Sequence, residues 1–528
     1  MKVPFLFLFL PIFQQIIEVS VKMSNIVVYR THIEITDYKP NDCPQIEKIF
    51  SVYDTTRHRY LPKGRIYDKK SSTLMLPRGI DINFLERIFC TNAIIDQSMD
   101  LIQDIYPVNL KYKPRDEIQK KAISFMLGIN DYKGMYDNCP MMSVNLNTGK
   151  GKTYCAIATA AYLALKTAVI TDNVGWLDQW KRFFLEYTDI DEKEIYQVSG
   201  TPSIMKLYKR DPSKYKVILF THATLKSFGD SKGWQEVSKL FNYLNIGIKF
   251  FDEAHLDFDN MFQIDCYTNT YRTYYLTATP GRSDMKENDI FGIYFQNVPS
   301  IDLYDKERDA HTRYAAIRFN SNPTPVEASA CSSKKYGLDR IAYADYLVRN
   351  ENFHKLLYIL VDMAIRKPGK HLFYVGTNEA ILYIKQWIYD NFPELVGCVG
   401  VYTSIVPANK RSEELNRKII LSTTKSAGAA MDIKDLVETV NLAEPFKSRV
   451  LAQQTFGRTR NNGTLYKDIV DTGFYYTKKF YDFKKPVFDK YATECIEINI
   501  KNDELTTRSD NIIKNRENLI QPMEFSDN

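Results

Sequence analysis

A mostly apolar run that ends in a glycine-containing turn and continues as a helix is the feature that most limits the possible folds of this chain. Residues 142–146 form the run, Asn-Thr-Gly-Lys-Gly-Lys-Thr follows at 147–153, and an alanine-rich stretch comes next. Gly149 and Gly151 let consecutive backbone N–H groups turn toward the oxygens of a phosphate. A turn of this kind between a strand and a helix predicts a phosphate-binding loop, although Leu146 stands where the general pattern has a glycine. A chance turn before a helix is the alternative.

Different residues of the predicted loop would bind the phosphates of ATP and the Mg²⁺ ion. The Lys152 ammonium would reach the terminal phosphates, and the Thr153 hydroxyl would hold Mg²⁺. The members of the loop that would surround the phosphates with backbone groups are Thr148, Gly149, Lys150 and Gly151.

Two acidic residues follow a strand-like run later in the chain. Residues 248–251 are Ile-Lys-Phe-Phe, and Asp252, Glu253, Ala254 and His255 come directly after them. Carboxylates at the carboxyl end of such a strand share the edge of a parallel sheet with the phosphate-binding loop. We therefore expect Asp252 to hold Mg²⁺ through water and Glu253 to orient and deprotonate an attacking water molecule. An ordinary polar strand end is the alternative for these residues taken alone.

Further motifs resemble those of superfamily 2 helicases and translocases, and they occur in that family's order. Beside Asp-Glu-Ala-His, seven stretches resemble family motifs, namely 146–153 (motif I), 170–180 (Ia), 219–225 (Ib), 276–280 (III), 371–377 (IV), 421–432 (V) and 454–460 (VI). The Asp-Glu-Ala-His spelling is that of DEAH-box helicases, and the compact lobes are most similar to phage and repair DNA helicases of the UvsW type. Asn147 and Asp172-Asn173 depart from the family pattern, which has a proline and Pro-Thr at these places.

The resemblance implies a nucleotide-binding role for residues outside the loop. Gln119, in Lys-Pro-Arg-Asp-Glu-Ile-Gln, corresponds to the family's adenine-reading glutamine, and a solvent-facing glutamine at a helix start is the alternative. Gly428 and Asp432 of motif V complete the implied nucleotide-binding set. In motif III, the hydroxyls of Thr277 and Thr279 would bond to Glu253 or His255 and couple the ATP site to nucleic acid.

Four threonines at the ends of predicted strands are candidates for contacts with a nucleic-acid backbone. Short hydroxyl donors in such places can bind successive phosphates without reading the base sequence. These residues are Thr221, Thr224, Thr377 and Thr423. Trp176 and Trp180 are instead expected to be core anchors of a helix rather than surfaces for base stacking.

Motif VI predicts an arginine that stabilises the charge of the transferring phosphoryl group. The family has two arginines three positions apart, whereas this chain has Arg458 and Arg460, with Asn461 after them. Arg458 is the favoured essential arginine, and Arg460 is an equal candidate for the finger that reaches the phosphate. Gln454 of the same motif is a further candidate for the catalytic set.

The order of helices and short β-branched or aromatic runs predicts the fold class. From Pro107 onward they alternate, as in a parallel sheet with crossover helices, and this pattern occurs twice. The runs expected to be strands are 143–146, 168–171, 217–220, 246–251 and 274–278 in the first series, and 371–375, 397–402, 419–422, 440–442 and 465–470 in the second. We expect an α/β protein with two RecA-like lobes of the P-loop NTPase type and a small N-terminal α+β accessory domain. The expected boundaries are an apolar leader at 1–22, the accessory domain at 23–105, the first lobe at 106–300, a linker at 301–345, the second lobe at 346–500 and a polar tail at 501–528.

The first 105 residues contain two features with open alternatives. Residues 57–70 form a basic stretch with aromatic residues between the charges, which is a candidate nucleic-acid contact or a solvated hairpin. The run Val3–Phe13 has the length of a signal-peptide core but lacks a cleavage site and is too short to cross a bilayer. We expect translation to begin at Met23 and the protein to be cytoplasmic, with a true leader or membrane-surface anchor as the alternative.

The net charge and the spacing of the cysteines limit which partners and which cellular compartment fit this chain. The net charge of +6 over 528 residues permits nucleic-acid binding without arguing for it. The eight cysteines are scattered singly, which favours a reducing compartment over a zinc site or a disulfide framework.

These features predict an ATP-dependent DNA helicase or translocase that uses ATP and Mg²⁺ to unwind or branch-migrate DNA in replication, recombination or repair. Its expected partner is single-stranded, forked or branched DNA. The alternatives are an RNA helicase and a double-strand DNA translocase that serves a nuclease or a remodelling complex.

Overall fold

The structure is a computed structural model that describes residues 24–520 apart from several short internal segments. The segments outside the description are 55–56, 97–103, 137–138, 147–149, 173, 255–257, 278–284, 305–308, 334–336, 428–432 and 459–462. The chain divides into two compact units, the first holding most residues up to Asp302 and the second most residues from Leu303 onward. The predicted apolar leader, 1–22, lies outside the described residues. Within the described part of the chain, no helix has both the length and the apolar character that crossing a membrane requires.

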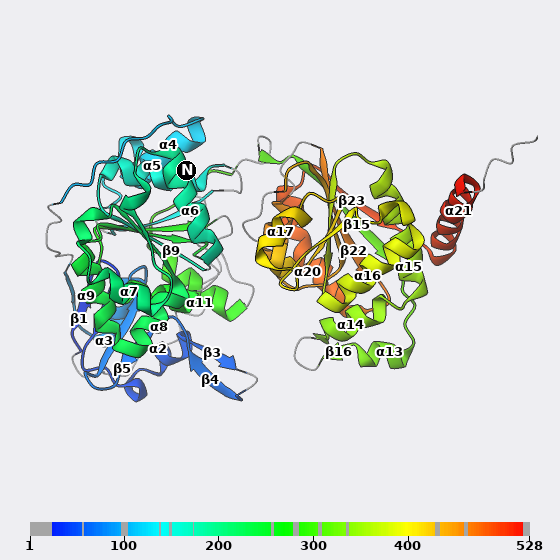
Figure 1. Cartoon of the computed structure of the whole chain (residues 1–528). Coiled ribbons are helices and arrows are strands. Elements are labelled where there is room, and N and C mark those ends of the chain that lie inside the picture. Colours follow the sequence, from blue (N-terminus) through cyan, green and yellow to red (C-terminus); the bar gives the residue numbers. More distant parts are fainter. Residues whose placement is uncertain are drawn as a thin grey trace, which may run out of the picture. The chain divides into compact units, whose positions relative to one another are not determined.

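The first unit is built on a sheet of seven parallel strands in the order β10-β11-β9-β12-β13-β8-β14 (Figure 1). The strands are β8 (Met141–Asn145), β9 (Thr167–Thr171), β10 (Ile195–Gln197), β11 (Val217–Thr221), β12 (Ile248–Asp252), β13 (Arg272–Thr277) and β14 (Ser300–Asp302). Five of them match the strands expected from sequence. The short edge strands β10 and β14 were not expected, because three residues carry too little pattern to be recognised.

Helices cover both faces of this sheet. One group consists of α4 (Glu117–Leu127), α5 (Lys152–Leu163) and α6 (Val174–Tyr187), and the other of α8 (His222–Lys232), α9 (Trp234–Leu244) and α10 (Phe258–Tyr267). The remaining helical segments are η2 (Asn130–Tyr132), η3 (Glu192–Glu194), α7 (Thr201–Leu207), η4 (Pro212–Lys214) and α11 (Met285–Phe295). Because all strands are parallel, every strand ends at the same edge of the sheet, where α5 and the residues after β12 lie.

The N-terminal module precedes this sheet and belongs to the same compact unit. Its five-stranded sheet has the order β5-β6-β2-β1-β7, and β3 and β4 form a separate antiparallel pair. Its elements are β1 (Ile26–Val28), β2 (His32–Ile35), η1 (Pro40–Asp42), α2 (Pro44–Ile49), β3 (Ser51–Asp54), β4 (Arg59–Pro62), β5 (Ile66–Asp68), β6 (Thr73–Pro77), α3 (Ile82–Phe89) and β7 (Ala93–Ile95). The expected α+β character of this region is confirmed.

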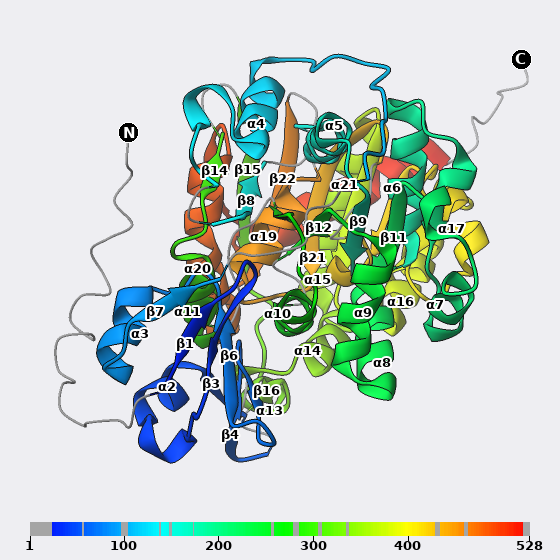
Figure 2. The ribbon, with the colours of Figure 1, turned by 90° about the vertical axis from the view of Figure 1, so that its left-hand side faces the viewer.

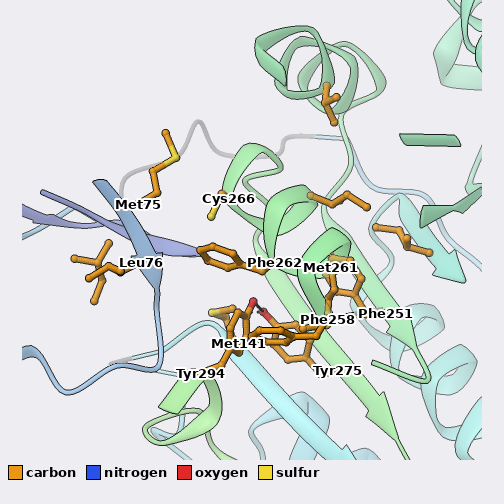
Figure 3. Packing of buried hydrophobic residues seen from close by; sticks show 14 of the residues in the cluster. Met75, Leu76, Met141, Phe251, Phe258, Met261, Phe262, Cys266, Tyr275 and Tyr294 are labelled. Carbon is orange, nitrogen blue, oxygen red and sulfur yellow. Dashed lines mark hydrogen bonds between the residues drawn. The ribbon is translucent and has the colours of Figure 1, made fainter. Parts of the chain in front are cut away.

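One hydrophobic core joins the module to the first lobe. Buried side chains of β6, such as Leu76, belong to the same cluster as Phe262 of α10 and Tyr294 of α11. Figure 3 shows Leu76 and Met75 on the module side, and Phe262 and Tyr294 on the lobe side, of this cluster. Figure 2 shows the module next to α10 and α11. The module and the lobe therefore share apolar surface that neither could bury alone.

The second unit has its own sheet of seven parallel strands, in the order β19-β20-β18-β21-β22-β15-β23. The strands are β15 (Thr312–Phe319), β18 (Lys370–Val375), β19 (Val399–Tyr402), β20 (Ile419–Ser422), β21 (Leu436–Ala443), β22 (Thr464–Asp471) and β23 (Cys495–Asn499). Its other elements are α13 (Pro325–Ala330), β16 (Ser332–Ser333), β17 (Gly337–Leu338), α14 (Arg340–Leu347), α15 (Glu351–Arg366), α16 (Asn378–Asn391), η5 (Pro393–Leu395), α17 (Ala408–Glu414), α18 (Thr424–Ala427), α19 (Arg449–Phe456), α20 (Tyr475–Tyr491) and α21 (Asn502–Ile520). The two predicted α/β lobes are present, and the fold class is confirmed.

Two segments differ from the sequence-based expectation. Residues 301–345, expected to be a linker, contribute β15 to the interior of the second sheet, where it pairs with β22 and β23. Residues 501–528, expected to be a polar tail, form α21 up to Ile520, which packs on α15 through buried residues such as Leu505. β15 is mostly apolar but lies in a segment whose other residues, such as Asn-Ser-Asn-Pro-Thr-Pro at 320–325, favour a linker. In α21 the apolar residues are sparse, and only tertiary packing buries them.

A glycine at the joint between module and lobe generates a prediction. The Cβ atom of an alanine at position 79 would lie 2.0 Å from the carbonyl oxygen of Tyr294. We expect Gly79→Ala to lower the free energy of unfolding by about 1–3 kcal/mol, because the backbone must shift to relieve the overlap. Gly292→Ala, on α11, is the control, since nothing lies within 4 Å of its new methyl group. Thermal unfolding of both variants checks this, and equal melting temperatures would contradict the role of Gly79.

Candidate functional site

A lysine and two carboxylates meet at the carboxyl edge of the first sheet. Lys152 begins α5, which follows β8, and Asp252 ends β12; β13 lies between these two strands. The Lys152 Nζ lies 2.7 Å from Glu253 Oε1 and 3.3 Å from Asp252 Oδ1. The structure thus brings together three of the residues predicted from sequence to bind and hydrolyse ATP.

Burial strengthens this cluster. The Lys152 and Asp252 side chains are each 13% exposed and that of Glu253 is 24% exposed. Burial alone would lower the pKa of Lys152, but the charges of Glu253 and Asp252 raise it above its usual value. A lysine ammonium beside two carboxylates fits a Mg²⁺-bound triphosphate, because the lysine would pair with phosphate oxygens and the carboxylates would hold the metal.

Glu253 has a backbone conformation that is rare for its residue type. Its φ is +50°, in the left-handed region, at the point where the chain leaves β12. The Glu253 N–H donates to Asp252 Oδ1 at 3.1 Å, and the Ala254 N–H donates to the carbonyl of Leu276 at 3.1 Å. Such strain persists where the surroundings impose it and is frequent at functional sites. It directs the Glu253 side chain toward Lys152.

Trp180 contributes to this site in a way that sequence did not reveal. As expected, Trp176 and Trp180 are buried, at 9% and 2% exposure. In addition, the Trp180 indole N–H donates to Asp252 Oδ2 at 2.8 Å. Asp252 is therefore held through one oxygen by Trp180 and through the other by Lys152. A helix that follows the neighbouring strand β9 places Trp180 there, and only the strand order β9-β12 makes the contact possible.

Gln119 is buried at the start of α4, which makes the solvent-facing alternative wrong. Its side chain is 4% exposed, and its Oε1 accepts a hydrogen bond from the Arg115 N–H at 2.8 Å. Asp116 caps the helix by accepting from the Gln119 N–H at 2.9 Å. These bonds orient the Gln119 amide, and its contact with adenine remains a prediction.

Three of the four candidate threonines cap helices. The Thr221 Oγ1 accepts from the Thr224 N–H at 3.1 Å at the start of α8, and the Thr377 Oγ1 accepts from the Ala380 N–H at 3.1 Å at the start of α16. The Thr423 Oγ1 accepts from the Ser426 N–H at 3.1 Å at the start of α18. Each helix begins where a parallel strand ends, so its partial positive charge lies at that edge of its sheet.

Thr224, the fourth candidate, lies inside α8. It is 8% exposed, and its hydroxyl receives a hydrogen bond from the Thr221 hydroxyl at 2.9 Å. Both hydroxyls therefore already serve the helix start, and the observed role of these threonines is structural.

Motif VI lies on and after α19 in the second unit. Gln454 is within the helix, and Arg458 follows its end with 7% exposure. Burial raises the pKa of Tyr374 in β18, whereas the positive charge of Arg458 lowers it. The Arg458 guanidinium therefore lies close to the Tyr374 ring. Several predicted site residues lie outside the described residues, namely Thr148, Gly149, His255, Thr279, Gly428, Asp432 and Arg460.

Glu444 is a buried acid near motif V that sequence did not single out. It follows β21 and is 7% exposed, and its carboxylate accepts from both the N–H and the hydroxyl of Thr424, each at 2.6 Å. Burial raises its pKa to about 7, against the lowering effect of these hydrogen bonds. Glu444 thus holds the start of α18, where motif V begins, in a manner that depends on pH near neutrality.

The basic stretch at 57–70 is only partly available for nucleic acid. Lys63 forms ion pairs with Asp259 of α10 and, at 3.6 Å, with Glu287 of α11. Arg65 forms an ion pair with Glu47, and its side chain is only 9% exposed. These two cations hold the module together and onto the lobe, so they do not form one continuous basic surface with the rest of the stretch.

Comparisons with known proteins agree with this fold. Residues 111–282 match the family described as "Type III restriction enzyme, res subunit". The transcript termination protein A18 of Yaba monkey tumor virus is 21% identical over 425 residues, which are 74% of this chain and 79% of that protein. The DNA 3'-5' helicase XPB of Mycobacterium tuberculosis is 30% identical over 150 residues, which are 28% of this chain and 25% of that protein.

A solved structure shares the fold. A fragment assigned as an HsdR subunit of a type I restriction enzyme from Vibrio vulnificus has a TM-score of 0.51 at 15% identity, with 89% of this chain and 85% of the fragment covered. The family match covers residues 111–282, and the likeness to the solved structure at 15% identity shows a common fold.

The raised pKa of the buried acid Glu444 predicts in which direction the stability of the chain changes with pH. Folding raises its pKa from 4.5 to about 7, so its contribution to stability is full below pH 4.5 and is lost as the pH rises through about 7. We expect Glu444→Gln, which keeps both bonding partners and cannot ionise, to stabilise the chain relative to wild type by about 1–3 kcal/mol at pH 8 and by less at pH 5.

A second buried acid on the same strand serves as the control. Burial alone would raise the pKa of Glu438, but the hydrogen bond with His371 and the ion pair with Lys467 hold it at about 2. Glu438→Gln should therefore destabilise the chain at both pH values. Thermal melting at pH 5 and pH 8 checks the pair, and a Glu444→Gln effect that is independent of pH would contradict the raised pKa.

Proposed function

We propose that this chain is an ATP-dependent superfamily 2 DNA helicase or translocase. The observation that carries the proposal is the buried cluster of Lys152, Asp252 and Glu253 at the carboxyl edge of a parallel sheet. A lysine at the first turn of the helix after β8 and two acids after β12 match the requirements of ATP hydrolysis in their order and in their spacing. The DEAH-box and UvsW-like assignments rest on the sequence motifs.

In this proposal, several residues of the first lobe have separate roles in ATP hydrolysis. ATP with Mg²⁺ supplies the electrophilic phosphorus atom and the metal charge that stabilises it. Lys152 would neutralise phosphate oxygens, and Thr153 and Asp252 would hold the metal. Glu253, directed by its backbone, accepts the proton of the attacking water.

The second lobe holds the motif VI residues to which the proposal gives a role in hydrolysis. Arg458 or Arg460 would stabilise charge on the transferring phosphoryl group, with Gln454 beside them. Gly428 and Asp432 would complete nucleotide binding. We propose that His255, Thr277 and Thr279 couple this event to nucleic acid.

Helix starts provide the proposed contacts with the nucleic-acid backbone. The N–H groups at the starts of α8, α16 and α18 would bind phosphates, with Thr221, Thr377 and Thr423 fixing the geometry of those starts. Such contacts read no bases, which suits a motor that moves along any sequence. The predicted domain boundaries stay a proposal, except for the linker and tail corrected above.

Replacing Lys152, the cation of this cluster, tests the proposed ATP hydrolysis directly. Lys152→Ala should reduce ATP hydrolysis by at least about a hundredfold, because it removes the phosphate ligand and leaves two buried carboxylates unneutralised. Lys181→Ala, an exposed lysine of α6 that pairs with Glu192, is the matched control and should hydrolyse ATP normally. Steady-state phosphate release measures both variants. Near-normal turnover of Lys152→Ala would contradict the phosphate-binding role.

The bond from Trp180 to Asp252 predicts an altered response to Mg²⁺. Trp180→Phe keeps the packing and removes the indole N–H, so Asp252 loses one of its two anchors. We expect the Mg²⁺ concentration for half-maximal nucleotide binding and hydrolysis to rise about tenfold. Trp176→Phe, on the same helix, should leave it unchanged. A Trp180→Phe variant with wild-type Mg²⁺ dependence would show that the bond is structural only.

A second candidate function is an RNA helicase. It is favoured by the likeness to a viral protein named for transcript termination, which covers 74% of this chain. ATP hydrolysis with single-stranded DNA, duplex DNA, a branched junction or RNA separates the candidates, with Glu253→Gln as the blank. Stimulation by duplex alone would indicate a translocase, and stimulation by RNA alone would replace DNA as the proposed substrate.

A further inference from the structure

A hairpin in the N-terminal module exposes two tyrosines on one face. Its strands, β3 and β4, pair in a register that sets Tyr53 directly opposite Tyr60. The two rings meet edge to face, with centroids 5.2 Å apart and an interplanar angle of 66°. Their side chains are 46% and 70% exposed. Figure 1 shows the hairpin extending from the module away from its five-stranded sheet.

The opposite face of the hairpin supplies the contacts that hold it in place. Val52, which points away from the tyrosine face, packs against the core shared by module and lobe, and its partner Leu61 is half-buried. The hairpin therefore already has one apolar face toward the protein. The tyrosine pair adds nothing to that core, so its exposure calls for another partner.

Positive charge lies next to the tyrosines. Arg57 and His58 are exposed at the tip between the two strands, and Arg59 is exposed at the start of β4. Asp54 is the acid opposite them; it accepts from the Arg57 N–H at 3.2 Å and lies 3.9 Å from the Arg57 guanidinium. The exposed tip thus combines two aromatic faces with two guanidinium groups.

The base of the hairpin is fixed to the first lobe. Lys63 directly follows β4, and its ion pairs with Asp259 and Glu287 tie it to α10 and α11. Gly64 comes next, at φ +66°, and the space a side chain would need there is taken by Ile290 and Phe258. The tyrosine face is therefore a rigid extension of the lobe that carries Lys152, and binding to it costs little ordering of the chain.

We propose that the strands β3 and β4, with Arg57, are a binding site for single-stranded nucleic acid, in which bases stack on Tyr53 and Tyr60 while Arg57 and Arg59 contact phosphates. Aromatic rings with adjacent cations are the recurring chemistry of single-strand binding, since every base has a π face and every linkage a charge. Bases within a duplex are already stacked on each other, so unpaired strands fit this surface best. The site shares no residue with the proposed ATP site.

Equilibrium binding to base-bearing and abasic strands tests the proposal in the full chain. Wild-type protein should bind a short oligothymidylate or oligouridylate more tightly than an abasic strand of the same length and charge. Tyr53→Ala with Tyr60→Ala should weaken binding to the base-bearing strand about tenfold and leave the abasic strand unchanged. Comparison of the deoxyribose and ribose strands identifies which sugar the hairpin accepts.

Two controls separate stacking from other effects. Tyr53→Phe with Tyr60→Phe keeps the rings and should bind as wild type, whereas Tyr475→Ala removes an equally exposed tyrosine of the second unit and should change nothing. The proposal would be overturned if the Tyr53→Ala, Tyr60→Ala variant lost affinity equally for base-bearing and abasic strands, or lost affinity for neither. The tyrosines would then be assigned to a protein partner or to the free surface.

The same samples distinguish failure of the hairpin from failure of the motor. ATP hydrolysis without nucleic acid depends on Lys152 and should be unchanged in the tyrosine variants. If the chain hydrolyses no ATP and the base-dependent binding is present, the proposed motor fails and the hairpin site stands.

Discussion

The contact between Lys152 and the two carboxylates after β12 is the interaction on which the arrangement of the first lobe depends. A buried cation needs a buried counter-charge, and the sheet supplies it because β8 and β12, separated only by β13, end at the same edge. Trp180 and the strained Glu253 backbone then orient the acids. A site held in this way would be pre-organised for the proposed phosphate and metal, which would lower the cost of assembling it during catalysis.

The core shared by the N-terminal module and the first lobe makes the module part of the same mechanical unit. Leu76 on one side and Tyr294 on the other belong to one buried cluster, and Lys63 adds ion pairs across the joint. Anything bound to the module is therefore carried with the proposed ATP-binding lobe. An unpaired strand on the proposed β3–β4 site would therefore be attached to the lobe that carries Lys152.

The sequence predicted much of this fold because parallel strands are long apolar runs between helices. All ten strands expected for the two lobes are present, and the P-loop lysine and both acids converge as predicted. The failures share one cause. β15 lies in a segment that favours a linker, α21 carries many polar residues, and the membership of both in the second unit depends on partners far away in sequence, which no local pattern shows.

Sequence by itself determined the type of chemistry. The order of Lys152, Asp252, Glu253 and Arg458 along the chain predicts phosphate binding and hydrolysis, because each residue type has few other uses at such strand and helix ends. Tertiary structure decided which side chains hold that chemistry in place. Trp180 lies on Asp252 because β9 neighbours β12, Glu444 supports motif V because β21 ends beside it, and the tyrosines of the hairpin are exposed because Val52 takes the core face. Strand order and burial are collective results of packing, so single residues in the sequence do not reveal them.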